Sequence, residues 1–529
     1  MTEPQPLWET ARLSAQRDFD ESRPPAERNR MGQFATPTGL ARAVLRVGLS
    51  HLPPGEPLRF LDPALGTGSF YSALLAERGD RPIVSATGIE LDPVVVDHAR
   101  RLWANTPLDV RAGDFTSLAP RAEDRANLLI ANPPYVRHHH LSQAAKGALT
   151  RSLRHATGLK VSGLAGLYCY FLMLSRAWMT DDGIAIWLIP SEFMDVNYGD
   201  MVKRFLLEQV TLLRIHRADP NDVQFDDALV SSAVVVLQNR PPPAEHLVRF
   251  SFGGTLERPA LERAVALGAL TEQPKWTRYP READAPTIDE GTPLGELFQI
   301  KRGIATGGND FFVLDDARVA ALGLSVEHLT PILPPPRRLP VDQVNARSDG
   351  SPELPNRAWL VRCALPEAEV AARHPALWRY LQSGVPEVSS GYLCSRRSPW
   401  YAQETRAPAP LLCTYMGREN RGRPFRFILN QSLAIAANVY LLLYPKPALA
   451  VALKDDPRLL ERIWRFLNSL DPKTLVREGR VYGGGLFKLE PTELAAVRVP
   501  HEVCGVNAGP TSEADQAPRQ MALGFRSAS

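Results

Sequence analysis

The chain of 529 residues is longer than one ordinary core, so about two to four domains are expected. Hydrophobic residues make up 44% and charged residues 22%, with no apolar run long enough for a membrane span and no secretory signal, so we expect a cytoplasmic protein. The net charge of +3 is nearly neutral, and any nucleic-acid surface must come from local basic clusters. The five cysteines form no Cys-x-x-Cys pair, which argues against disulfides and structural zinc, and no metal is expected.

The first motif is GQFATP, at residues 32–37, after a charged segment that we expect to form a helix or an arm. An amphipathic stretch follows over residues 39–52. Thr36 is a suitable N-cap for a helix there, with Pro37 at the first helical position. Taken alone, the motif indicates no more than the start of a helix.

A strand, a glycine-containing loop and a helix are predicted from LRFLDPALGTGSFYSALL, residues 58–75. The strand ends in Asp62, the loop carries Gly66 and Gly68, and the helix begins near Ser69. Glycines let a ligand approach the backbone, and the N-terminus of the following helix favours a carboxylate or phosphate. The full G-x-G-x-x-G spacing is absent, which counts against a nicotinamide dinucleotide site.

Two further strands are predicted to lead into acidic residues. Residues 84–89 lead to Glu90, whose carboxylate has the reach to accept both hydroxyls of a ribose. Residues 108–111 lead to Asp114, which could accept from an adenine amino group, and to Phe115, which could pack on the adenine ring. Each acidic residue alone is more often a cap or a surface charge, but their recurrence at successive strand ends favours a binding site.

The fourth strand carries the most informative motif, LLIANPPY, at residues 128–135. Asn132 offers an amide acceptor and Pro133 a carbonyl acceptor, and neither proline has an N–H group that would compete. Two converging acceptors suit an exocyclic amine on an aromatic ring, because accepting both hydrogens leaves the nitrogen nucleophilic. Tyr135 could stack on the same base. An ordinary proline turn after a buried strand is the competing interpretation.

The elements after this motif are predicted as a polar loop, a helix and three strands. The loop VRHHHLS, which begins at Val136, has no nearby acidic partner and is interpreted as solvated or phosphate-facing rather than as a metal site. The helix is expected over residues 166–178. The strands are expected at 183–193, 210–216 and 231–237, with Phe225 in the loop between the last two.

In this order, GQFATP, LDPALGTGSF, GIELDP, AGDF and NPPY resemble the motifs of the gamma-class, Taq-type DNA adenine-N6 methyltransferases of restriction-modification systems. The resemblance covers about residues 30–240 and implies an α/β fold, with a Rossmann-like class I methyltransferase sheet and S-adenosyl-L-methionine as cofactor. It implies that the target amine binds Asn132 and Pro133, and that Tyr135 and Phe225 stack on the target base, although Phe225 could equally be a core residue. The cofactor contacts that it implies are Thr36, Pro37, Asp62, Ala64, Gly66, Glu90, Asp114, Phe115 and Phe171.

The C-terminal half is basic in one stretch, which suits the target-recognition domain of this family. Between Gly391 and Asn430, seven arginines face two glutamates and alternate with aromatic residues, an arrangement that favours nucleic acid, with a solvated basic face as the alternative. Residues 294–314 lack the P-loop spacing and are interpreted as a turn near DNA phosphates or an ordinary hairpin. The candidate DNA contacts are Arg396, Arg397, Arg418, Arg421 and Arg423.

We therefore predict a catalytic domain at residues 1–245, a linker at 246–290, a mixed α/β recognition domain at 291–505 and a disordered tail at 506–529. The expected reaction is methylation of adenine N6 in duplex DNA. The alternatives are N4 methylation of cytosine, methylation of RNA or protein through the same pocket, and a DNA-binding specificity protein without catalysis. The expected partners are double-stranded DNA and a separate restriction endonuclease, with the enzyme monomeric on DNA and away from membranes.

Overall fold

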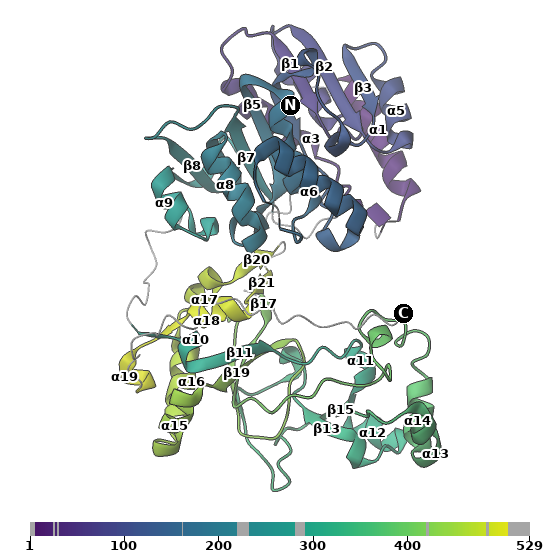
Figure 1. Cartoon of the computed structure of the whole chain (residues 1–529), viewed down its shortest axis with the longest axis vertical. Coiled ribbons are helices and arrows are strands. Elements are labelled where there is room, and N and C mark those ends of the chain that lie inside the picture. Colours follow the sequence, from purple (N-terminus) through teal and green to yellow (C-terminus); the bar gives the residue numbers. More distant parts are fainter. Residues whose placement is uncertain are drawn as a thin grey trace. The chain divides into compact units, whose positions relative to one another are not determined.

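The computed structural model describes residues 6–24, 27–28, 31–160, 162–219, 232–280, 291–418, 423–482 and 486–505. The chain divides into two compact units, and each is described by itself (Figure 1). Residues 1–284 with 480–486 form the first unit, and residues 285–479 with 487–529 form the second. Among the described residues, no helix has the length and apolar character needed to cross a membrane.

A nine-stranded sheet in the order β3-β2-β1-β4-β5-β7-β6-β8-β9 forms the centre of the first unit. The strands β1 to β5 run parallel to one another, whereas β7 runs antiparallel to both β5 and β6. The first seven positions have the order of a class I methyltransferase sheet, so the predicted fold class is confirmed. The strands are β1 (Leu58–Asp62), β2 (Ile83–Glu90), β3 (Leu108–Ala112), β4 (Ala126–Ala131), β5 (Met179–Pro190), β6 (Thr211–Arg217), β7 (Ser232–Gln238), β8 (Leu247–Gly254) and β9 (Pro259–Ala266).

Helices cover both faces of this sheet, because alternate strand residues point to opposite sides. Leu128 and Ile130 of β4 pack in one core with α3, α4 and α5, whereas Leu129 and Ala131 pack in the other core with α6, α7 and α8 (Figure 1). The apolar run before the NPPY motif is therefore buried on both faces. The helices are α1 (Leu7–Ser22), α3 (Thr38–Ser50), α4 (Ser69–Glu77), α5 (Pro93–Leu102), α6 (Gln143–Thr157), α7 (Leu167–Leu174), α8 (Asp200–Glu208) and α9 (Leu267–Glu272).

The span predicted as a linker, residues 246–290, is instead structured over most of its described part. Both β8 and β9 lie within it, with β8 parallel to β6 and β9 antiparallel to β8. Val248 and Phe250 of β8 are buried in the same core as β4 and β5. The linker prediction is wrong here because the proline-rich segment before β8 is a turn between strands of one sheet.

The second unit is a mixed α/β unit with a five-stranded sheet in the order β11-β19-β16-β18-β14 and smaller sheets β12-β15-β13 and β10-β22. The strands are β10 (Thr292–Pro293), β11 (Phe298–Arg302), β12 (Val313–Asp315), β13 (Leu329–Ile332), β14 (Gln343–Val344), β15 (Ala358–Val361), β16 (Leu411–Thr414), β17 (Met416–Arg418), β18 (Phe427–Asn430), β19 (Tyr440–Pro445), β21 (Leu486–Lys488) and β22 (Arg498–Val499); β20 (Arg480–Tyr482) groups with the first unit. The helices are α10 (Leu294–Leu297), α11 (Asn309–Phe312), α12 (Asp316–Leu322), α13 (Glu367–Arg373), α14 (Pro375–Gln382), α15 (Pro447–Asp455), α16 (Leu459–Ser469), α17 (Pro472–Glu478), α18 (Pro491–Ala496) and α19 (His501–Cys504).

Candidate active site

The glycine-containing loop and the NPPY segment follow neighbouring strands of the first unit. Strands β1 and β4 are parallel, with Phe60 opposite Leu128 and Leu61 opposite Leu129. The chain crosses from β1 to β2 and β3 on one side and then returns to β4 on the other side. Ligands of open α/β sheets bind where the strand order reverses in this way, beyond the carboxyl ends of the strands. The glycine-containing loop and the NPPY segment therefore follow strands that meet at one switch point.

The amide of Asn132 is held in one orientation by the GQFATP segment. Its Nδ2 donates to the carbonyl oxygen of Phe34 at 3.0 Å and to Oγ1 of Thr36 at 3.1 Å. A carbonyl oxygen can only accept, so the NH₂ group must face Phe34, and Oδ1 is left as the acceptor of this half-buried amide. Within the described part of the chain, no group donates to this Oδ1.

Thr36 was predicted to cap the following helix, and the structure contradicts this role. Helix α3 begins at Thr38, and its N-cap is Pro37, without a side-chain capping bond. Thr36 is buried, and its hydroxyl accepts from Asn132 instead. The physical reason is that the helix begins one residue later than predicted, so Pro37 stands at the N-cap position and the Thr36 hydroxyl serves as an acceptor for the half-buried amide of Asn132.

Tyr135 is held firmly at the same place. Its backbone N donates to the carbonyl of Gly32 at 3.2 Å, and its Oη donates to the carbonyl of Leu188 at 3.1 Å. Its ring centroid lies 5.6 Å from that of Phe34. Burial raises the pKa of Tyr135, so the hydroxyl stays neutral. The backbone approach depends on Gly32, whose φ is +68° and where a Cβ would lie 2.3 Å from Tyr135 N.

Asp62 and Glu90 place two carboxylates at the ends of adjacent strands. Oδ1 of Asp62 accepts from Ala64 N at 3.0 Å, and the two oxygens of Glu90 accept from Gly66 N and Asp92 N, each at 2.9 Å. Burial, together with the Glu90 carboxylate, raises the pKa of Asp62 to about 8. Burial also raises the pKa of Glu90. The glycine loop is thus tied to both carboxylates, which lie in a poorly hydrated place.

The two residues predicted after β3 differ in their surroundings. Asp114 is exposed and accepts from Thr116 N at 2.9 Å, so it caps a short 3₁₀ helix. Phe115 is buried, and its ring lies 5.1 Å from that of Phe171 and 5.4 Å from that of Trp178. The predicted adenine-pocket residues Phe115 and Phe171 are therefore brought together, although they are 56 positions apart in the sequence.

A buried ion pair that the sequence analysis missed lies against the glycine loop. Arg12 of α1 is only 1% exposed and pairs with Glu9 at 2.6 Å. Its Nη1 also donates to Ser69 Oγ at 2.9 Å and Thr67 Oγ1 at 3.4 Å. The spacing of three residues permits a pair on a helix, but a solvated pair has the same spacing, so no sequence signal could identify the burial.

S-adenosyl-L-methionine suits the residues present at this site. At Gly66, with φ of +55°, the position of a Cβ has no other atom within 4 Å, so the loop leaves open space. The carboxylates of Asp62 and Glu90 border this loop and suit a cationic ligand that also carries hydroxyl groups. A cavity of about 410 Å³ lies at the opposite ends of β4 and β5, near Arg125 and Met179, and is not part of this site.

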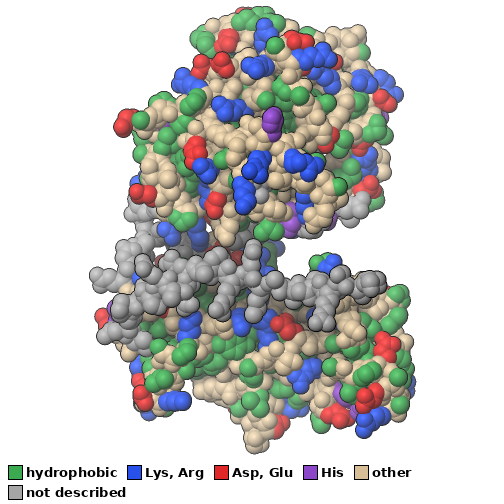
Figure 2. All heavy atoms as spheres, in the orientation of Figure 1, with side chains coloured by type: hydrophobic (Ala, Val, Ile, Leu, Met, Phe, Trp, Pro, Cys, Tyr) green, Lys and Arg blue, Asp and Glu red, His purple; other side chains and the backbone are tan. Residues whose placement is uncertain are grey.

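The predicted DNA-contacting arginines that the structure describes in the second unit are either exposed or engaged within the unit. Arg396 and Arg423 are exposed, and the guanidinium of Arg396 lies 3.8 Å from the ring centroid of Tyr392. Arg418 is exposed as well. On the face drawn in Figure 2, basic side chains are interspersed with acidic ones rather than gathered in one patch. Phe225 and Arg421 lie outside the described residues.

Arg397 is engaged inside the second unit, in contrast to its predicted exposure to DNA. Its Nη1 donates to Thr306 O at 2.7 Å, and its Nη2 donates to Ala305 O at 2.6 Å. These carbonyls belong to the turn after β11. The turn is not a hairpin, because β11 pairs with β19 and β12 pairs with β15. Arg397 therefore stabilises this turn, and its guanidinium makes these hydrogen bonds within the protein.

The sheet order, the carboxylates at the ends of β1 and β2, and the NPPY segment after β4 define a Rossmann-like protein of the class I methyltransferase fold. Two family profiles match the chain. Residues 102–224 match the Eco57I restriction-modification methylase, and residues 284–524 match the C-terminal domain of the type II methyltransferase M.Eco57I. Over these two spans the chain is similar to the Eco57I-type restriction-modification methylases.

Individual relatives agree with these profiles over most of the chain. The type II methyltransferase M.XamI of Xanthomonas campestris pv. amaranthicola is 27% identical, over 89% of this chain and 85% of the relative. The type II methyltransferase M.AccI of Acinetobacter calcoaceticus is 22% identical, over 91% of this chain and 87% of the relative. The type IIL restriction-modification enzyme MmeI, solved in complex with DNA, matches 88% of this chain and 64% of its own, with a TM-score of 0.51 and 12% identity, which supports the fold alone.

Proposed function

We propose that this protein is a site-specific DNA methyltransferase that transfers a methyl group from S-adenosyl-L-methionine to N6 of an adenine flipped out of duplex DNA. Its role would be the modification activity of a restriction-modification system. The similarity to M.XamI and M.AccI over most of both chains supports the class of reaction. The residues at the end of β4 support the choice of target.

The observation that carries the proposal is the orientation of the Asn132 amide. Its NH₂ group is used by Phe34 O and Thr36 Oγ1, so its carbonyl oxygen is available to a ligand. A free amide acceptor next to Pro133, whose nitrogen has no hydrogen, suits a neutral amine donor. When both amine hydrogens are accepted, electron density stays on the nitrogen, which raises its nucleophilicity without a strong base.

The glycine loop supports the cofactor assignment. Asp62, Ala64 and Gly66 would line the methionine part of S-adenosyl-L-methionine, Glu90 would accept the ribose hydroxyls, and Phe115 with Phe171 would contact the adenine. Thr36, Pro37 and Asp114 complete the proposed set. When bound, S-adenosyl-L-methionine supplies a methyl group activated by a sulfonium, which no metal needs to assist.

Aromatic stacking would hold the flipped base. Tyr135 has its hydroxyl anchored on Leu188 and its backbone on Gly32, so its ring has little freedom to move away. A preorganised ring of this kind loses little entropy when a base stacks on it. We propose Phe225 for the opposite face. The proton released from the amine after transfer would pass to solvent, because the site holds neutral acceptors beside the amine.

Replacement of Asn132 tests this mechanism. Asn132→Ala removes both the amide acceptor and the donor to Phe34, and we expect methyl transfer to fall by at least ~10³-fold, the size found when a key transition-state contact is lost. Binding of S-adenosyl-L-methionine should change only a few-fold. The measurements are incorporation of tritiated methyl into DNA and calorimetric titration of the cofactor. Full activity of Asn132→Ala would overturn the assignment.

Thr36 provides the matched pair of variants. Thr36→Ser keeps the hydroxyl that Asn132 contacts at 3.1 Å, whereas Thr36→Val removes it. We expect activity to be retained in the first variant and lowered by roughly tenfold in the second, as for one lost hydrogen bond.

Identification of the methylated nucleoside by mass spectrometry decides which base is the target. N4-methylcytosine as the product would refute adenine specificity while leaving the proposed methyl transfer intact.

A further inference from the structure

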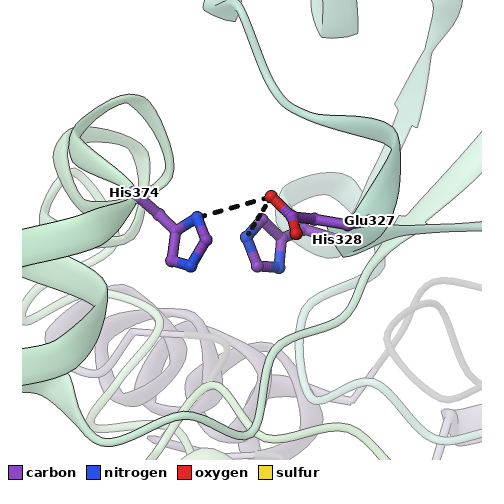
Figure 3. A group of neighbouring side chains, drawn as sticks. All are labelled: Glu327, His328 and His374. Carbon is purple, nitrogen blue, oxygen red and sulfur yellow. Dashed lines mark ion pairs between the residues drawn. The ribbon is translucent and has the colours of Figure 1, made fainter.

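Three potential metal ligands converge in the second unit, far in sequence from the proposed catalytic residues. Glu327 and His328 belong to a 3₁₀ turn, Val326–His328, directly before β13, and His374 lies at the junction of α13 and α14. The ligand atoms of the three side chains all lie within 4.8 Å of one another. Figure 3 shows both imidazole rings approaching the same carboxylate oxygen of Glu327.

The spacing of the ligand atoms fits a tetrahedral ion. Oε1 of Glu327 lies 3.6 Å from Nε2 of His328 and 3.5 Å from Nδ1 of His374. Ligand atoms about 2.1 Å from a tetrahedral ion lie about 3.4 Å apart, whereas neighbouring ligands at the same bond length around an octahedral ion lie about 3.0 Å apart. The two separations from Glu327 are close to the tetrahedral value. Two imidazoles with one carboxylate suit zinc better than calcium or magnesium, which prefer oxygen ligands.

One of these ligand atoms has no hydrogen-bond partner in the part of the chain that the structure describes. That atom is Nε2 of His328, which is buried in a residue only 7% exposed. Its 3.6 Å separation from Glu327 is too long for a hydrogen bond. A buried polar atom without a partner destabilises the folded state, so its presence calls for an explanation.

The two imidazole rings are also oriented alike with respect to the carboxylate. Their centroids are 4.3 Å apart and nearly perpendicular, and each ring holds one nitrogen atom towards the same carboxylate oxygen, as ligands of one metal ion do.

We propose that Glu327, His328 and His374 bind one Zn²⁺ ion, with water as the fourth ligand. The ion would connect the turn before β13 to the α13–α14 junction, which are separated by more than forty residues of sequence. This connection would stabilise the fold of the second unit through mass action, since only the folded chain brings the ligands together. The proposal does not depend on the methyltransferase activity.

The test uses the full chain, freed of metal with a chelator and then titrated with Zn²⁺ and, separately, Co²⁺. We expect one Zn²⁺ per chain by calorimetry and elemental analysis, a visible d–d absorption band of tetrahedral Co²⁺, and a rise of about 3 °C or more in the Tm of the chain on saturation. His374→Gln and Glu327→Gln should each weaken Zn²⁺ binding by at least ~30-fold, since each removes one of three ligands.

Both substituted residues are partly exposed, so these variants should fold without metal, which circular dichroism checks. The matched control is His155→Gln, at an exposed histidine of α6, which should bind Zn²⁺ as the unchanged protein does. The proposal is refuted if the unchanged chain binds no Zn²⁺, or if His374→Gln and Glu327→Gln retain the stoichiometry, affinity and Co²⁺ spectrum of the unchanged chain.

Discussion

At the scale of single residues, the charge of Asp62 decides how the glycine loop receives a cation. Burial and the nearby Glu90 raise the pKa of Asp62 from 3.8 to about 8. Folding therefore favours the protonated form, and the stability that protonation contributes is lost progressively as the pH rises from about 3.8 to about 8. Above that pH the carboxylate is ionised, and it attracts a positively charged ligand. Folding stability therefore falls up to about pH 8, the pH at which ionisation of Asp62 in the folded chain begins to favour binding of a cation.

We expect the affinity for S-adenosyl-L-methionine to weaken as the pH falls below 8, by up to roughly tenfold per pH unit where binding requires the ionised form of Asp62. Calorimetric titrations between pH 6.5 and 9 on the unchanged chain and on Asp62→Asn would measure this. The ratio of the two dissociation constants at each pH reports the ionisation of Asp62 alone, because titration of the ligand itself affects both proteins equally. A ratio that stays constant over this range would contradict the prediction.

At the scale of elements, α1 contacts the glycine loop through a buried ion pair, Glu9 and Arg12. Burial acts to raise the pKa of Glu9, but hydrogen bonds from Arg12, Ser72 and Thr38 outweigh it and keep the pKa below its usual value. The carboxylate therefore stays ionised in a place where water is scarce. An ionised group in such a place depends on its partner, because an unpaired buried charge strongly destabilises the folded state.

Arg12→Met is accordingly expected to lower the free energy of unfolding by about 3 kcal/mol and to weaken cofactor binding, because Thr67 and Ser69 lose their donor. Denaturation in urea measures the first effect. The control is Arg17→Met, at an exposed position of the same helix, which should change stability by less than about 0.5 kcal/mol. The double variant Glu9→Leu, Arg12→Met should recover part of the lost free energy of unfolding, because no unpaired charge is then buried. Equal effects of Arg12→Met and Arg17→Met on stability would be inconsistent with a buried ion pair.

At the scale of the whole molecule, the second unit is the proposed DNA-recognition part, and its arginines are not equivalent. Arg426 donates to Asp342 at 2.7 Å and to the carbonyls of Pro336 and Leu339, each at 3.1 Å. Like Arg397, it holds loops of the unit in place. Arg396 and Arg423 are exposed, and they remain the better candidates for phosphate contacts.

We expect Arg396→Ala and Arg423→Ala each to lower the slope of log affinity for DNA against log salt concentration by about 1, because one phosphate contact is lost. Arg426→Ala should instead lower the Tm and leave the salt dependence of the folded protein unchanged. Fluorescence anisotropy with duplex DNA at several salt concentrations separates these outcomes. Unchanged slopes in both exposed-site variants would place the phosphate contacts elsewhere.

Much of the first unit could be predicted from local sequence patterns. The strands ending at Asp62 and Glu90 and the strand leading to Asn132 lie where the apolar runs predicted them. These runs are long enough to be buried, and glycine and proline mark their ends, so neighbouring residues carry the information. The linker prediction failed at β8 and β9 because these strands follow a proline-rich turn and β9 is largely exposed, so this part of the sequence resembles an exposed connection.

The side-chain partners could not be predicted, since each joins residues that are distant in sequence. The sequence by itself determined the set of polar residues at the strand ends, because periodicity and turn chemistry are properties of consecutive residues. The fold class followed from the resemblance of its motifs, in their order, to those of a known methyltransferase family. Only the tertiary structure decided that Thr36 accepts a hydrogen bond from Asn132 rather than capping a helix, and that Arg12 donates to the glycine loop. The same holds for the approach of Glu327 to His374. Those contacts arise from the packing of elements against each other, which no local pattern encodes.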